Sequence, residues 1–162
     1  MKQPNGKKRI GILVCGNTHQ DMNCNSTMCL LDFQRGRSAF AGQPDRELIG
    51  IISCAGCPTL AAPEKILHRV RPLVDLGAEA IHISSCMMML CPFKQKYKGL
   101  IEKAFPEIAV VEGTHFPPEG MSAEEAGKQF VQCAHDMLCA PRPAMARVAQ
   151  ALYPDEFSAP HQ

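Results

Sequence analysis

The sequence has few of the features on which nucleic-acid and membrane proteins depend. It contains no Trp and only two Tyr, so aromatic platforms for stacked bases are scarce. No charge of one sign dominates, because 17 Lys and Arg face 16 Asp and Glu, spread along the chain, for a net charge of +1. The apolar run after the basic N-terminus, residues 10–14, is too short for a signal peptide or a membrane span. We expect no nucleic-acid or membrane partner and a cytoplasmic protein.

Cysteine, by contrast, is abundant. The chain has nine cysteines, an odd number that cannot pair completely as disulfides, at positions 15, 24, 29, 54, 57, 86, 91, 133 and 139. In a reducing compartment, a high density of thiols indicates metal or redox chemistry. The length of 162 residues suits a single domain, 1–162, with a core over residues 9–139 and a loose tail over about 153–162.

Four short apolar segments rich in Val and Ile indicate strands, at residues 9–14, 47–53, 79–85 and 107–112. Helical patterns separate them, which is typical of successive βαβ units. The sequence therefore predicts a three-layer α/β fold, Rossmann-like or flavodoxin-like, with an open parallel sheet of about four strands and helices on both faces.

The helical segments differ in clarity. An apolar stripe from Phe93 to Ala104, with Pro92 in the first turn, predicts one helix. A second runs from Pro63 to Gly77, where we expect Pro72 to kink or shorten it. A capping box, Ser122-Ala-Glu-Glu125, opens a third. Weaker helices are predicted over 26–38, interrupted by Gly36, and around 145–152.

A ligand-type residue follows each predicted strand: Cys15, Cys54, Cys86 and, after the fourth strand, His115. Because parallel strands end at one edge of a sheet, where open α/β sheets bind ligands, these side chains should converge. The loops that leave the same edge add Cys24, Cys29, Cys57 and Cys91. The eight residues predicted as candidate metal ligands are Cys15, Cys24, Cys29, Cys54, Cys57, Cys86, Cys91 and His115.

Two spacings strengthen this prediction. Cys54-x-x-Cys57 lets two sulfurs bind one ion, and Cys86-x4-Cys91 spans a short turn, as ligand pairs of tetrahedral thiolate sites do. Cys57 and Cys91 each precede a proline, and Cys91 stands at an expected helix start, so we expect the pKa of both thiols to be lowered. Lowered thiol pKa values suit metal ligands and nucleophiles alike.

Other Cys and His residues have simpler interpretations. Cys133 lies on the apolar stripe of its helix and is expected in the core, and Cys139 is given no role. His82 alternates with Ile81 and Ile83 along the third predicted strand, which indicates a buried imidazole with a hydrogen-bond partner rather than a ligand.

Together these segments resemble the CGGC-domain family. The matching pieces are RIGILVCG at 9–16, the Cys24 and Cys29 spacing, ISCAGCP at 52–58, IHISSC at 81–86 followed by Cys91-Pro92, and VEGTH at 111–115. The resemblance implies a metal-binding, zinc-binding domain, and it brings no particular reaction with it. Ala55 stands where the family motif has its first Gly, which adds one methyl group between the two sulfurs.

Two functions therefore stay open. The first is a metal-binding protein whose partner is a metal ion, with zinc suited to a mixed Cys and His set and an iron–sulfur cluster as the alternative cofactor. The second is a thiol–disulfide oxidoreductase that uses Cys54 and Cys57, one attacking and the other resolving. The redox pair leaves the other cysteines and His115 unexplained, so we place the metal site first.

Overall fold

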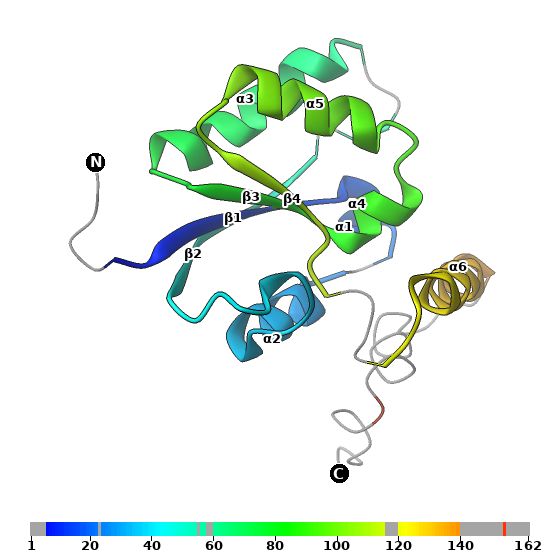
Figure 1. The fold of residues 1–162 in the computed structure, drawn as a ribbon. Coiled ribbons are helices and arrows are strands. Elements are labelled where there is room, and N and C mark those ends of the chain that lie inside the picture. Colours follow the sequence, from blue (N-terminus) through cyan, green and yellow to red (C-terminus); the bar gives the residue numbers. More distant parts are fainter. Residues whose placement is uncertain are drawn as a thin grey trace.

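A computed structural model describes residues 6–22, 24–54, 56–57, 60–115, 120–139 and 154. Its centre is a parallel sheet of four strands in the order β2-β1-β3-β4 (Figure 1). The strands are β1 (Lys8–Val14), β2 (Arg46–Ser53), β3 (Ala80–Ile83) and β4 (Ala109–Glu112). The predicted strands and the open parallel sheet are confirmed, although β3 ends two residues earlier than the sequence indicates.

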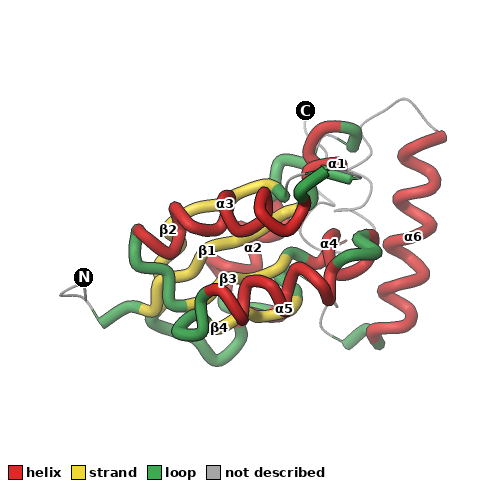
Figure 2. Tube along the Cα trace, turned by 90° about the horizontal axis from the view of Figure 1, so that it is seen from above, coloured by secondary structure: helices red, strands yellow, loops and turns green. Residues whose placement is uncertain are grey.

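Helices cover both faces of the sheet. One face is packed against α3 (Ala62–Asp75) and α5 (Lys94–Ala104), and the other against α2 (Thr27–Arg35) and the short 3-10 helix η1 (Ser38–Phe40) (Figure 1). Three more helices lie toward the C-terminal ends of the strands: α1 (Gly16–Gln20), α4 (Ser85–Leu90) and α6 (Ala123–Cys139) (Figure 2). The three-layer α/β prediction is confirmed, and the strand order is that of flavodoxin-like sheets.

Two paired glycines set the distance between α3 and the sheet. Gly11 of β1 and Gly50 of β2 are register partners. A Cβ atom on Gly11 would lie 2.8 Å from Leu73 Cδ1, and one on Gly50 would lie 2.8 Å from Leu73 Cδ2. Both distances are shorter than carbon atoms tolerate, so the absence of side chains on two adjacent strands lets Leu73 sit directly on the backbone.

The helix predictions are confirmed in outline and corrected in detail. Pro72 lies inside α3, which continues to Asp75 instead of being shortened there, and the left-handed Gly77 ends the turn that follows. The helix predicted to begin at Pro92 starts two residues later, so Phe93 precedes it. The capping box is present, since the Glu125 N–H donates to Ser122 Oγ at 3.2 Å. The helix predicted around 145–152 lies outside the described residues.

One segment between Cys86 and Cys91 differs from the prediction. We expected a short turn there, but residues Ser85–Leu90 form the helix α4, with Cys91 as its C-terminal cap. The residues Met87, Met88 and Met89 pack against the core beside α3 and α5, and this apolar burial favours a helix over an open turn. No helix in the described part of the chain is long and apolar enough to cross a membrane.

The face covered by α2 and η1 has an aromatic centre. Phe40 is fully buried, with its ring stacked on the His82 imidazole at a centroid distance of 4.5 Å. His82 Nδ1 donates to the Gly113 carbonyl at 3.2 Å, whereas its Nε2 has no hydrogen-bond partner among the described residues. The prediction of a buried imidazole is confirmed, but only one of its nitrogens is satisfied. Burial accordingly lowers the pKa of His82 to about 4.

This imidazole should make the fold sensitive to acid. Because the pKa of His82 is about 4 in the folded chain and about 6.5 in the unfolded chain, the unfolded state binds the proton first as the pH falls. The free energy of unfolding should therefore be unaffected by this group above pH 6.5 and decrease by roughly 3 kcal/mol between pH 6.5 and pH 4.

Urea unfolding at several pH values, compared with the variant His82→Gln, measures this term. Gln keeps an N–H donor for Gly113 and cannot titrate. The difference in unfolding free energy between the two proteins should be constant above pH 6.5 and shift in favour of the variant below it. A constant difference down to pH 4 would show that His82 does not titrate as stated.

Candidate functional site

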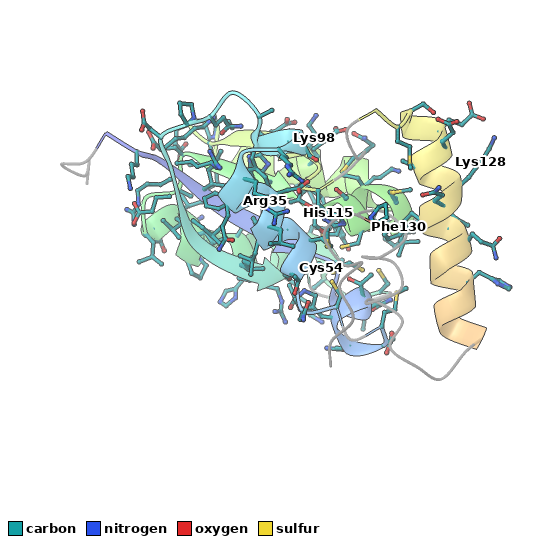
Figure 3. The ribbon with its side chains drawn as sticks, turned by 90° about the horizontal axis from the view of Figure 1, so that it is seen from below. Arg35, Cys54, Lys98, His115, Lys128 and Phe130 are labelled. Carbon is teal, nitrogen blue, oxygen red and sulfur yellow. The ribbon has the colours of Figure 1, made fainter. Side chains whose placement is uncertain are left out.

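All four strands point the same way, so their C-terminal ends meet at one edge of the sheet. The chain turns to one side after β1 and to the other side after β2, which places the topological switch point between β1 and β3. Open α/β sheets bind ligands at such a point. Figure 3 shows Cys54 and His115 at this end of the domain, the end at which α6 stands.

Cysteines and one histidine gather along this edge. We call the set the cysteine rim: Cys15, Cys24, Cys29, Cys54, Cys57, Cys86, Cys91 and His115. The seven cysteines are free thiols in the structure, and only Cys57 is exposed, while Cys24 is half-buried. The side chains of Cys133 and Cys139 lie outside what the structure describes.

The first thiol pair joins the ends of β1 and β2. Val14 and Ser53 are register partners, and the Cys54 N–H donates to the Val14 carbonyl at 2.8 Å, so Cys15 and Cys54 leave the sheet side by side. The Cys15 thiol hydrogen-bonds to the Cys54 sulfur, which lowers the pKa of Cys54 and raises that of Cys15. We call Cys15 and Cys54 the inner pair, because each is only 6% exposed.

Backbone groups also favour negative charge on Cys54. The Gly16 N–H donates to Cys54 Sγ at 3.2 Å. The Gly56 backbone N–H and the Arg69 guanidinium also lower the pKa of Cys54. Burial raises this pKa, but by less than Cys15 lowers it. A Cβ on Gly16 would lie 3.4 Å from the Cys54 carbonyl oxygen and 3.7 Å from its sulfur. The lack of a side chain at Gly16 therefore leaves space for Cys54 beside the end of β1. Cys54 is thus the favoured thiolate of the inner pair.

The second pair consists of Cys57 and Cys91, which we call the outer pair. Cys57 raises the pKa of Cys91, which indicates that the two thiols lie near each other, although the two residues come from different loops. Cys57 is exposed, whereas Cys91 is 6% exposed. The two cysteines of the C-x-x-C motif therefore belong to different pairs, one facing Cys15 and the other facing Cys91.

The expectation of a lowered pKa at Cys91 is wrong. Burial raises the pKa of this thiol, and the neighbouring sulfurs of Cys57 and Cys54 raise it further. The helix argument fails because Cys91 caps the C-terminus of α4, with its N–H donating to the Met87 carbonyl at 3.0 Å, and does not begin α5. The C-terminal end of a helix disfavours a thiolate.

Cys86 lies between the inner pair and the rest of the rim. Its sulfur is 3.0 Å from Ser84 Oγ, and the Thr18 hydroxyl donates to it at 3.5 Å. Cys86 raises the pKa values of Cys15, Cys24 and Cys29, so it lies near all three thiols. Cys86 contacts the hydroxyls of Ser84 and Thr18, and Cys91 lies near Cys57, so the Cys86-x4-Cys91 spacing does not form a sulfur pair.

At the far side of the rim, His115 is packed against Cys29. The Cys29 sulfur is 3.4 Å from His115 Nδ1 and 3.3 Å from Thr114 Oγ1. His115 is 4% exposed, and burial lowers its pKa to about 4, while burial raises the pKa of Cys29 to about 12. Both groups are therefore neutral at pH 7, in contrast to Cys54.

Sequence reasoning missed the hydroxyl groups that line the rim. Ser85 Oγ accepts from the Thr114 N–H at 3.0 Å, and Thr18 is 2% exposed with its hydroxyl bonded to the Cys15 carbonyl at 2.9 Å. The sequence signal for these hydroxyls was the segment Ser84-Ser85-Cys86 and the pair Thr114-His115, because short polar residues beside ligand-type residues often orient them.

A pocket adjoins the outer pair. It has a volume of about 280 Å³, and its walls come from residues 60–63 and from the first turn of α5 with the residue before it. Tyr97 belongs to both features, because it lines the pocket and its pKa is raised by burial and by Cys91, Cys57 and Cys54. The lining residues are Leu60, Ala61, Ala62, Pro63, Phe93, Lys96 and Tyr97.

The rim is not a closed metal cage in this structure. Within the described ranges, no three or more His, Cys, Asp or Glu side chains are positioned around one point that could hold a metal ion. What the structure brings together are pairs: Cys15 with Cys54, Cys57 with Cys91, and Cys29 with His115. The assignment of the eight residues as metal ligands stays a prediction.

Comparison with known proteins identifies a matching family model and a relative. The family model described as CGGC domain matches residues 9–115. An uncharacterized protein of Methanocaldococcus jannaschii, MJ0582, is 32% identical over 117 residues, which cover 66% of this chain and 86% of the relative. No solved structure gives a significant match.

Proposed function

We propose that this chain, which belongs to the CGGC domain family, is a metal-binding protein whose cysteine rim holds a zinc ion. The observation that carries the proposal is the arrangement of the inner and outer pairs, four thiols from the loops after β1, β2 and α4 at one edge of the sheet. Thiolates are soft ligands and select zinc, copper(I) or iron–sulfur clusters over hard cations.

The donor chemistry of these residues fits zinc. Cys54 is stabilised as a thiolate by the Cys15 thiol and the Gly16 N–H before any ion arrives, and zinc binds thiolates, not thiols. We assign Cys15, Cys54, Cys57 and Cys91 as the ligands. A bound zinc ion would keep all four sulfurs deprotonated, and it would supply Lewis acidity if one position were left to water or substrate.

In this proposal the ion itself organises the site. Because no three ligand-type side chains among the described residues already surround one point, the two pairs must draw together to share an ion. The sheet and its two apolar layers are complete without it, since the core side chains Ile10, Ile12 and Ile83 are fully buried. Removal of the metal should therefore leave the fold intact, unlike the unfolding seen in zinc fingers.

The four assigned thiols suit a tetrahedral zinc ion, and four thiolates also hold the common cubane and two-iron clusters. The test of the proposal must therefore be able to detect a cluster.

Elemental analysis combined with a visible absorption spectrum tests the proposal. The full chain is purified without oxygen and without a metal-binding tag. Stoichiometric zinc and a colourless solution are expected, and replacement by Co²⁺ should give the intense sulfur-to-cobalt absorption of a thiolate site. Iron with labile sulfide and a brown colour would overturn zinc in favour of a cluster. No metal, together with no thiolate absorption on adding Co²⁺, would overturn metal binding itself.

A further inference from the structure

We infer that the pocket at the starts of α3 and α5 is a binding site for a small carboxylic acid, bound as its anion. The apolar part of the ligand lies against Leu60, Pro63 and Phe93, and its carboxylate lies at Lys96 and Tyr97. None of these residues is a proposed zinc ligand, so this site does not depend on the metal.

The pocket lies where two helices begin. α3 follows β2, and α5 follows β3 and α4, so both helices start at the edge where the C-terminal ends of the strands meet. The two helices pack side by side on one face of the sheet (Figure 1). Ala61 and Ala62 belong to the start of α3, and Phe93 belongs to the start of α5. Open α/β sheets bind ligands at this edge.

The pocket is small and its walls are mostly apolar. Leu60, Pro63, Phe93 and two alanines make up five of its seven lining residues. Its volume of about 280 Å³ lies just below the range of about 300–1,000 Å³ that holds drug-sized ligands. Leu60 is 91% exposed and Phe93 is 41% exposed, so apolar surface is open to an incoming molecule. The ligand is therefore small and largely apolar.

The charge at the pocket is positive. Lys96 lines the pocket and makes no hydrogen bond or ion pair with the residues that the structure describes. Neither α3 nor α5 has a side-chain cap at its start, and the first turn of α5 contains no acidic residue. Glu64 stands in the first turn of α3 but does not line the pocket. Because helix starts and an ammonium group both favour negative charge, the ligand is an anion.

Tyr97 is a buried polar residue in the pocket wall. It is 3% exposed, and its hydroxyl has no hydrogen-bond partner among the described residues. A buried hydroxyl without a partner is unfavourable, because it has lost its bonds to water. An acceptor oxygen on the ligand would satisfy this hydroxyl, and Lys96 from the same helical turn would balance the charge of the ligand.

One ammonium and one hydroxyl suit a carboxylate better than a phosphate. A carboxylate carries one negative charge and accepts hydrogen bonds on two oxygens. Phosphate sites commonly use Arg side chains or glycine-rich loops, because they must balance more charge on more oxygens. The described lining residues include neither Arg nor Gly.

Titration of the full chain with 3-phenylpropionate, followed by ¹H–¹⁵N NMR spectra, tests this inference. The reference ligand is 3-phenylpropanamide, which has the same apolar body and no charge. We expect 3-phenylpropionate to shift the signals of residues 60–62 and 93–97 and to bind about tenfold more tightly than the amide. Absence of shifts in both ranges, or equal affinity for the two compounds, would overturn the site.

The variant Lys96→Gln tests whether the charge of this residue holds the ligand. It should weaken binding of 3-phenylpropionate about tenfold and leave binding of the amide unchanged. Lys103→Gln is the matched control, because Lys103 is an exposed lysine in the last turn of the same helix, and it should change neither affinity. Equal loss of affinity in both variants would show a general charge effect and contradict the site.

The variant Tyr97→Phe removes only the hydroxyl and keeps the ring in the core. It should weaken binding of 3-phenylpropionate about threefold, with no loss in the midpoint of urea unfolding. An unchanged affinity for 3-phenylpropionate would remove Tyr97 from the site.

Two further measurements locate the carboxylate and identify what carries it. The titration is repeated after a chelator has removed any bound metal: unchanged binding supports the pocket, whereas loss of binding would place the carboxylate on the ion. A short peptide with a C-terminal phenylalanine is compared with 3-phenylpropionate. Weaker binding of the peptide supports a small acid, and tighter binding would replace it by a polypeptide terminus. A chain that contains no metal but binds 3-phenylpropionate in the pocket loses the zinc proposal and keeps this site.

Discussion

A chain with both Cys54→Ser and Cys57→Ser should contain no bound metal and still fold. The two residues belong to different thiol pairs, so the double change removes one sulfur from each pair and leaves two donors, too few for a tetrahedral zinc site. The metal content of the purified protein should fall from stoichiometric to background. Because Cys54 is buried but small, we expect its replacement to cost only about 1 kcal/mol of stability.

Cys24→Ser is the control for this experiment. Cys24 is a half-buried thiol of the same cysteine rim, but it belongs to neither pair, so its loss should leave the zinc content unchanged. Elemental analysis and urea unfolding of the three proteins give the comparison. Full metal retention in the double variant would move the ligand set to Cys29, His115 and Cys86 and would contradict the assignment made here.

Replacement of Phe40 by alanine should destabilise the fold by about 3–5 kcal/mol. Phe40 is fully buried between α2 and the sheet, where its ring stacks on His82 at 4.5 Å and meets Phe33 edge-on at 5.3 Å. The residue comes from a 3-10 helix of three residues, and truncation of its ring would leave a cavity between α2 and the sheet. The midpoint of urea unfolding measures the loss.

The variant Phe93→Ala tests whether the loss of stability depends on burial of the ring. Phe93 has the same side chain but is 41% exposed, where it lines the pocket, so its truncation should change the free energy of unfolding by no more than about 0.5 kcal/mol. Phe40→Leu, which keeps part of the volume, should fall between the two. Equal losses for Phe40→Ala and Phe93→Ala would mean that the face of the sheet under η1 is not a tightly packed core.

Much of the fold could be predicted from local pattern. The strands needed only short Val- and Ile-rich segments, and the parallel sheet needed only the helices between them. The packing of Phe40 could not be predicted in this way, because a single aromatic residue in a short irregular segment has no periodicity. Likewise Pro72 marks a helix boundary in isolation, but burial of Ile66, Val70 and Leu73 against the sheet holds α3 together past it.

The sequence by itself determined which residues gather at the functional edge. Cys15 and Cys54 directly follow β1 and β2, and parallel strands must end on the same side. Only the tertiary structure decided which sulfur faces which. Spacing along the chain suggested Cys54 with Cys57 and Cys86 with Cys91, but strand register sets Cys54 beside Cys15, and the formation of α4 makes Cys91 the C-terminal cap of a helix. Contacts between side chains depend on register and helix rotation, which pair residues that are distant in sequence.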